Sequence, residues 1–135
     1  MSDDSDLPVD RGWLCQRIVE RAGEAVLFAD TDGAIRLWND AAEEIFGYPR
    51  AEAIGASLDI IVPEAFREAH WRGYDAALEA GETTSPPVTR TQVPARHADG
   101  TTIEIETSGA RVVRGEDGEP IGVFNLIRDV TGTER

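Results

Sequence analysis

The imidazole of His70 could bind a metal, and this residue lies inside the segment PEAFREAHWRGY at residues 63–74. On a helix, Phe66, His70 and Tyr74 are spaced four residues apart and therefore share one face. A neutral imidazole on an apolar helical face can bind a haem iron through a ring nitrogen. The same histidine can also be an ordinary helical residue that hydrogen-bonds to a neighbour or to solvent, so the spacing leaves both interpretations open.

Other candidate binding residues lie on or beside the predicted strands. Trp38 ends the segment AIRLW and either lines a cavity or packs in the core, and we favour core packing. Asn39 can bind a ligand or cap the next helix, and Asp40 with Glu43 also has the spacing of a capping box. Asn125 interrupts the apolar run of the last strand, where a buried amide would need a hydrogen-bond partner.

The many carboxylates suggest an enzyme, but their arrangement favours a solvent-exposed surface. Glu104 and Glu106 alternate along a predicted amphipathic strand, whereas a catalytic pair needs a cleft and a shifted pKa. The sequence contains no nucleophile elbow, phosphate-binding loop, dinucleotide-binding glycine pattern or HExxH motif. The single cysteine, Cys15, excludes an internal disulfide and a multi-cysteine metal site. We therefore expect no catalytic residues and no enzyme.

The composition restricts the partners. The chain has 135 residues, which suits one domain, and its formal net charge is −13. An acidic surface repels phosphate backbones, so we expect no direct nucleic-acid binding. The acidity fits a salt-rich cytoplasm and plain solubility alike. Because we find no signal peptide and no apolar run long enough to span a bilayer, we expect a cytoplasmic protein without a membrane partner.

The order of the predicted elements places these residues in an α+β fold. We expect a flexible, acidic tail at residues 1–10, a folded domain at 11–131 and the start of an exit segment at 132–135. Hydrophobic patterns and turn residues predict helices over 12–22, 40–47, 49–55 and 63–80. They predict strands over 25–30, 34–38, 89–97, 101–113 and 121–130. This order favours one five-stranded antiparallel sheet, with helices covering one face and a cavity between the layers.

Three stretches of the sequence resemble the PAS family. They are WNDAAEEIFGYPRAEAIG at 38–55, HADGTTIEIE at 97–106 and GVFNLIRDVT at 122–131, in the order expected for that family. The resemblance implies a PAS domain over 11–131 with a sensory role. The final Asp-Val-Thr resembles the usual exit into a signalling helix. Only GTER follows it, so we expect either output in trans, through a partner such as a kinase or a regulator of transcription, or a fragment of a longer protein.

The helix around His70 also resembles the haem-binding oxygen sensors of the FixL type. Those domains carry a Pro-Glu pair, then an arginine, then the proximal histidine, and Pro63, Glu64, Arg67 and His70 match that spacing. The resemblance implies that His70 is the proximal haem ligand.

One departure from the FixL pattern concerns the strand arginine that senses the bound gas in that group. The matching position here is Thr91, and Arg90 is one residue away. A slip of one residue in a strand reverses the face, unless a bulge near Pro86 and Pro87 restores it. Arg90 is therefore a candidate whose orientation decides its role, and Arg96 is a second candidate.

Three functions remain open. The first is a sensory module that binds a small ligand or a partner in the cavity and relays a conformational signal. The second is a haem-based gas or redox sensor. The third is a ligand-free dimerisation module whose contact is formed by Leu14 and Ile18, on the first helix, and by the exposed face of the sheet. We also expect the protein to be a homodimer through this first helix. Haem is the first candidate cofactor. Flavin is the second candidate cofactor. It could bind only non-covalently, because a covalent bond needs a cysteine near the pocket and Cys15 precedes the first strand.

Overall fold

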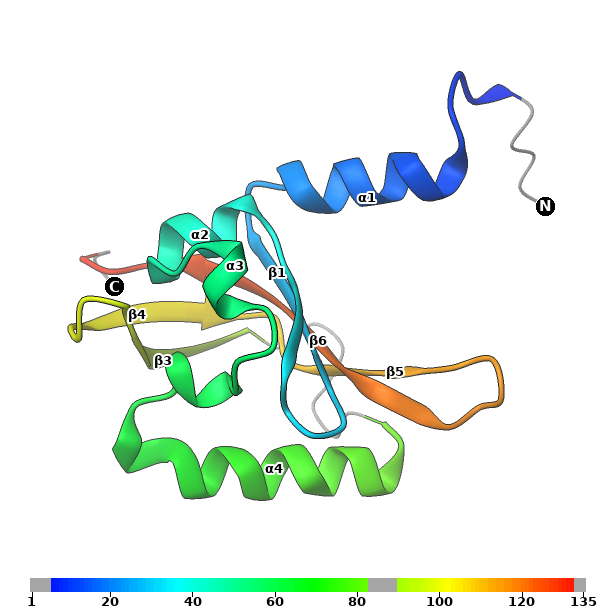
Figure 1. Ribbon diagram of the computed structural model, residues 1–135. Helices are drawn as coiled ribbons and strands as arrows, with labels where there is room; N and C mark the ends of the chain where they lie inside the picture. Colours follow the sequence, from blue (N-terminus) through cyan, green and yellow to red (C-terminus); the bar gives the residue numbers. More distant parts are fainter. Residues whose placement is uncertain (1–5, 83–89, 133–135) are drawn as a thin grey trace.

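The sheet has six antiparallel strands within residues 6–82 and 90–132, the parts of the chain that the computed structural model describes. The strand order is β2-β1-β6-β4-β3, and β5 also pairs with β6 (Figure 1). The α+β class and the antiparallel pairing confirm the prediction. The strands are β1 (Ala25–Asp30), β2 (Ile35–Trp38), β3 (Thr91–Arg96), β4 (Thr102–Thr107), β5 (Arg111–Arg114) and β6 (Pro120–Asp129).

The predicted count of five strands is wrong, because the strand expected at 101–113 is two strands, β4 and β5. Both pair with the edge of β6 that β1 leaves free. Thr107 lies opposite Ile127, whereas Arg111 lies opposite Phe124, so β4–β5 contains one residue more than β6 over this stretch. An extra residue shifts every following side chain to the other face. As a result Val112, and not Val113, packs against the core.

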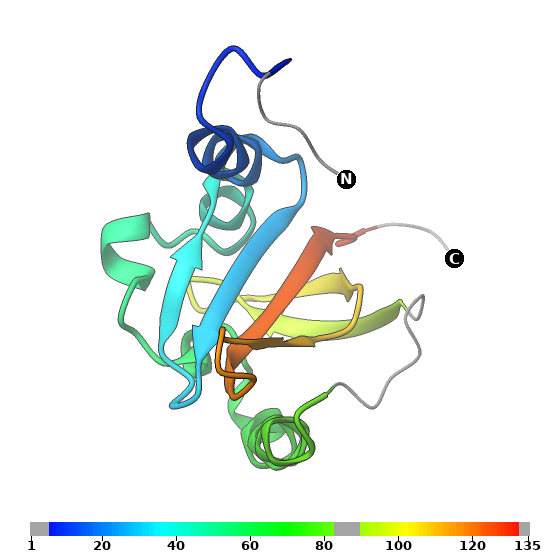
Figure 2. The same ribbon diagram turned by 90° about the vertical axis from the view of Figure 1, so that its right-hand side faces the viewer.

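Most of the helices lie between β2 and β3. They are α2 (Asp40–Phe46), α3 (Arg50–Ala53), the 3₁₀ turns η2 (Leu58–Ile60) and η3 (Glu64–Phe66), and α4 (Arg67–Ala80). The helix predicted from Pro63 therefore begins with a 3₁₀ turn. It ends as predicted at Gly81, whose φ of 77° is a left-handed conformation that glycine adopts without strain. Helix α4 lies alongside the sheet and forms one wall of the site described below (Figure 2).

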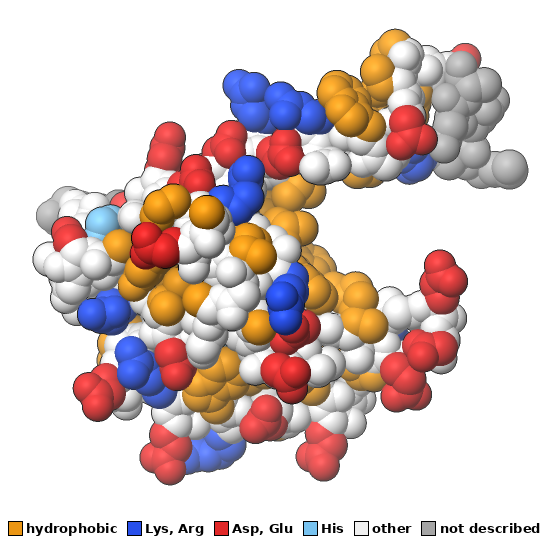
Figure 3. All heavy atoms as spheres, viewed as in Figure 1, with side chains coloured by type: hydrophobic (Ala, Val, Ile, Leu, Met, Phe, Trp, Pro, Cys, Tyr) orange, Lys and Arg blue, Asp and Glu red, His pale blue; other side chains and the backbone are white. Residues whose placement is uncertain are grey.

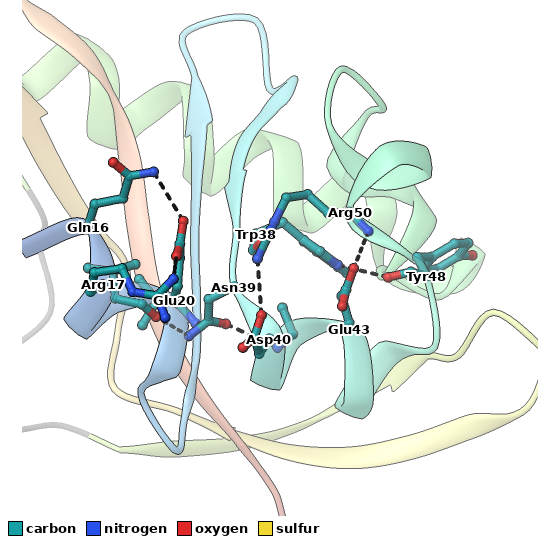
Figure 4. Close-up of polar contacts among 12 residues, drawn as sticks. Gln16, Arg17, Glu20, Trp38, Asn39, Asp40, Glu43, Tyr48 and Arg50 are labelled. Atoms are coloured by element: carbon teal, nitrogen blue, oxygen red, sulfur yellow. Dashed lines mark hydrogen bonds and ion pairs between the residues drawn. The ribbon is translucent and has the colours of Figure 1, made fainter. Parts of the chain in front are cut away.

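A fully hydrogen-bonded asparagine joins α2 to the sheet (Figure 4). Asn39 is 1% exposed, and its Oδ1 accepts from the backbone N–H groups of Val26 and Ala42. Its Nδ2 donates to the carbonyls of Val19 and Glu24. Asn39 is thus the N-cap of α2, so the alternative capping box from Asp40 is not used. Glu43 instead accepts from the backbone N–H of Arg50.

The first helix, α1 (Arg11–Arg21), extends away from the rest of the molecule (Figures 1 and 3). Asp10 caps it by accepting from the N–H of Trp13, so this residue of the expected tail is part of the helix cap. Residues 1–5 of that tail and 133–135 of the expected exit segment lie outside the described residues. No residue of α1 is buried, and Ile18 is 59% exposed. The helix therefore presents apolar surface that this single chain does not cover.

Candidate functional site

A cavity of about 380 Å³ lies between α4 and the inner face of the sheet. This volume is within the range of small-molecule pockets. The sheet wall is largely apolar, with Leu27, Ile105, Val123 and Ile127 among its side chains. The opposite wall comes from η2, η3, α4 and the residues between them. Three predicted site residues, Phe66, His70 and Tyr74, border the cavity from this helical side, together with Asn125 from the sheet.

The histidine on the helical wall, His70, has a lowered pKa. Burial disfavours the charged imidazolium and holds the pKa of His70 below its usual 6.5, although the nearby Asp59 carboxylate acts in the opposite direction. Its Nδ1 is buried and has no hydrogen-bond partner among the described residues. The ring contacts Trp71 and Tyr74, with centroid distances of 4.7 and 5.8 Å. Burial therefore favours the neutral form of the His70 imidazole, and one of its ring nitrogens has no hydrogen-bond partner among the described residues.

The neighbours of His70 fix α4 in place. The Tyr74 hydroxyl donates to the carbonyls of Ala29, at 3.1 Å, and Asp30, at 2.6 Å. The Trp71 indole donates to Asp59 Oδ1 at 2.7 Å, and its ring lies so close to Gly33 that a Cβ there would be 2.2 Å from it. These contacts join the helix to the end of β1 and to η2. The histidine thus sits on a rigid support.

Phe66 and Asn125 lie at different depths. Phe66 is 50% exposed, so it forms the rim of the cavity and not its interior. Asn125 lies on the central strand β6, opposite Leu27 of β1, and its Oδ1 is buried without a partner in the described part of the chain. Within the described residues, each wall of the cavity therefore includes one side chain with a buried polar atom that has no hydrogen-bond partner.

Two other predicted site residues lie away from this cavity. Trp38 is 2% exposed in the core, where it packs on Phe46 and its indole donates to the carbonyl of Tyr48, as the core-packing interpretation expected. Arg90 precedes β3, is exposed and does not line the cavity. It approaches Glu106 at 3.6 Å on the outer face.

The expectation that a slip of one residue turns Arg90 outward agrees with this placement. Arg96 is also exposed and lies near the Tyr48 hydroxyl. The bulge considered near Pro86 and Pro87 lies outside the described residues.

The comparisons with known proteins agree with this architecture. The model of the PAS fold matches residues 14–130. The chain belongs to the PAS family. Such domains are generally sensory modules.

Two relatives of this PAS domain are named as sensors. It is 33% identical over 118 residues to the sensor protein FixL of Bradyrhizobium diazoefficiens, covering 84% of this chain and 22% of FixL. It is 41% identical over 46 residues to the oxygen sensor protein DosP of Escherichia coli, covering 34% of this chain and 6% of DosP. The chain thus spans less than a quarter of either relative.

Solved structures share the fold. A PAS domain from Colwellia psychrerythraea has a TM-score of 0.76 at 23% identity, covering 90% of this chain and 98% of that one. An RNA-binding light-oxygen-voltage receptor has a TM-score of 0.73 at 21% identity, covering 97% of this chain and 37% of the receptor. In the described part of this PAS domain, no helix combines the length and the apolar character needed to cross a bilayer.

Sequence reasoning missed several residues of the site. Thr107 and Ala110 line the cavity on either side of the β4–β5 break, and Asp59 contributes to the electrostatics of His70. Strand alternation from Ile105 identifies Thr107, but the extra residue that brings Ala110 inward leaves no pattern in the sequence. Asp59 is close to His70 only because η2 packs against α4, which is a tertiary contact.

Proposed function

We propose that this PAS domain binds haem in the cavity between α4 and the sheet and acts as a gas or redox sensor, with His70 as the iron ligand. The observation that carries the proposal is a buried ring nitrogen without a partner among the described residues, on a histidine whose charged form is disfavoured by burial, at the wall of an apolar cavity. Neutral imidazole is the form that ligates metals, and a buried nitrogen without a partner destabilises the fold unless a ligand uses the site.

The residues present fit this group. The apolar sheet wall, including Leu27 and Ile127, would suit a porphyrin, and His70 would hold its iron. When bound, haem supplies an iron that takes up diatomic gases or changes oxidation state. The names of the two relatives, a sensor and an oxygen sensor, support the same role.

A pair of histidine variants tests the iron ligand. We expect purified protein supplied with haem to show a Soret band, and we expect His70→Ala to lose it while keeping its circular dichroism spectrum. His97→Ala is the matched control, because His97 lies beside the 98–101 turn, where its Nδ1 accepts from the N–H of Asp99. Equal haem spectra in both variants would show that the ligand assignment is wrong.

A protein that takes up no haem would refute the proposal and return the cavity to the broader function, a sensor of a smaller ligand. A flavin spectrum in protein purified from cells would instead identify the non-covalent flavin, the weaker candidate.

We further propose that the domain works as a homodimer through α1. Trp13 is 52% and Ile18 59% exposed, and Figure 3 shows hydrophobic atoms on this helix and in the notch beneath it. Exposed apolar surface of this kind marks a contact site. We expect deletion of residues 1–22 to convert a dimer into a monomer in light scattering. A full-length protein that is already monomeric would contradict this.

The signal then consists of a shift between two arrangements of the sheet and α1. Asn39 supports this route, because it bonds the end of α1, the start of β1 and α2 together. We propose a non-catalytic, cytoplasmic domain whose output comes from a signalling partner, such as a kinase or a transcription regulator. Pull-down with purified candidate partners, with and without haem, measures whether partner binding depends on haem.

A further inference from the structure

Trp71 follows His70 on α4 and is held by two groups that lie outside the helix. Its indole N–H donates to Oδ1 of Asp59, in η2, at 2.7 Å. Its ring also covers Gly33, in the turn between β1 and β2, where any larger residue would collide with it. Both contacts must break before the indole can change rotamer. Trp71 is therefore a fixed surface beside the histidine.

The Trp71 ring limits the movement of the His70 imidazole. The two ring centroids are 4.7 Å apart and the planes are inclined at 78°, an edge-on contact. Neighbouring residues on a helix point about 100° apart around its axis, so their rings meet only when both side chains turn toward each other. Tyr74 also lies near the imidazole, at 5.8 Å, and is itself fixed by hydrogen bonds to the end of β1. The imidazole is thus bounded by two anchored rings.

We propose that Asp59, acting through Trp71, is a positioning residue that keeps the His70 imidazole in one orientation, ready to bind iron. This inference rests on the proposed haem function and adds to it the group that orients the ligand. A metal-binding histidine is usually oriented by a hydrogen bond from its second ring nitrogen. Within the described residues Nδ1 of His70 has no such partner, and the carboxylate of Asp59 accepts from Trp71. The orientation therefore passes through a ring contact.

The carboxylate of Asp59 is separable from the bonds that hold η2 against α4. Arg67 makes those bonds, because its Nε donates to the carbonyl of Val62 at 3.0 Å and its Nη2 to the carbonyl of Asp59 at 3.2 Å. Both acceptors are backbone atoms, so a change of the Asp59 side chain leaves them in place. The side chain is also partly exposed. A variant at this position should therefore fold.

Two variants of Asp59 test the inference. Asp59→Ala removes the acceptor of the indole N–H, whereas Asp59→Asn removes the charge and keeps an oxygen that can accept. In haem-free protein, we expect NMR couplings to show one His70 rotamer in the wild type and in Asp59→Asn, and a mixture in Asp59→Ala. In haem-loaded protein, Asp59→Ala should lose haem to an excess of a scavenging protein about three- to tenfold faster, as the loss of one hydrogen bond predicts.

The rate of haem loss in Asp59→Asn should stay within about twofold of the wild type. An Asp59→Asn variant as impaired as Asp59→Ala would show that the charge acts and not the hydrogen bond, and would overturn the inference. A wild-type rotamer in Asp59→Ala would also overturn it, since a merely structural role lowers the melting temperature without turning the ring.

A double-mutant cycle tests the route through Trp71. We expect Trp71→Leu to accelerate haem loss, and Asp59→Ala in that background to add less than about twofold, because the group through which it acts is gone. Trp13→Leu is the matched control, since this tryptophan is exposed on α1. A further acceleration of about threefold or more in the double variant would show that Asp59 acts on His70 without Trp71, which overturns the route.

The two proposals fail in different ways. A Soret band in the wild type, with equal rates of haem loss in the wild type and Asp59→Ala, would refute the positioning role and leave the haem function standing. The absence of a Soret band in the wild type would refute both.

Discussion

Two asparagines in the same sheet have opposite surroundings. Asn39, at the end of β2, makes four hydrogen bonds with its side chain, and these join α1, β1 and α2. Asn125, in the middle of β6, has a buried amide oxygen without a hydrogen-bond partner among the described residues. A buried polar group with every bond made specifies the fold, whereas one left unpaired beside a cavity indicates a binding site. The predictions below test this difference.

The largest effect is expected at Asn39. Asn39→Leu leaves two carbonyls and two N–H groups without this partner, so we expect the free energy of unfolding to fall by about 3–5 kcal/mol in urea titrations. Asp40→Ala, one residue away and exposed, should change it by less than about 1 kcal/mol. A small loss in Asn39→Leu would contradict the contrast with Asn125, whose unpaired oxygen should contribute nothing to stability.

A smaller loss is expected at Tyr74, a paired group at the edge of the cavity. Tyr74→Phe removes the bonds to the carbonyls of Ala29 and Asp30, and we expect a loss of about 1–2 kcal/mol in unfolding free energy. Tyr48→Phe removes a comparable bond to the carbonyl of Ile60, away from the cavity. Haem uptake should weaken only in Tyr74→Phe. Equal uptake in both variants would show that the hydroxyl does not position the site.

The unpaired histidine should produce a pH dependence. The pKa of His70 is lowered in the folded state, so between pH 6.5 and that lower pKa the unfolded chain binds more protons. Stability should therefore fall as the pH drops through this window, and His70→Phe should remove that part of the fall. Chemical denaturation of haem-free protein at a series of pH values measures both slopes. If wild type and His70→Phe lose stability equally as the pH falls, the pKa of His70 is not lowered by the fold.

The smallest effect is expected at the exposed carboxylates. Glu106 pairs with Arg128 and Arg90 on the outer face of the sheet, where solvent and salt screen the interaction. We expect Glu106→Gln to shift the melting temperature by no more than about 2 °C. Any hydrolytic or transfer activity that this variant abolishes would contradict the proposal of a non-catalytic domain.

Much of the fold was predictable because its signals are local. The apolar run at 25–30, the turn before β2 and the glycines after α2 and α4 identify those elements from neighbouring residues alone. The break between β4 and β5 was not predictable from the sequence, because Ser108 and Gly109 are compatible with a continuous strand. Its position depends on how Phe124 and Ile127 align with the partner strands.

The site was predictable only in part for a related reason. Helical spacing placed Phe66, His70 and Tyr74 on one face, and all three border the cavity. Whether the histidine is paired depends on Asp59, whose carboxylate accepts from Trp71 instead. Such competition for a partner is decided by tertiary packing and leaves no pattern in the sequence.

Helix α4 is held at both ends by arginines. At its start, Arg67 donates to the carbonyls of Val62 and Asp59, and at its end Arg114 donates to the carbonyl of Gly81. In mechanical terms, this 14-residue helix is a rod about 21 Å long that is clamped at each end. Sliding it along its axis would break a clamp, whereas bending it would not. A molecule that presses on His70, in the first half of the rod, should therefore bend the helix while the hydrogen bonds at both of its ends stay in place.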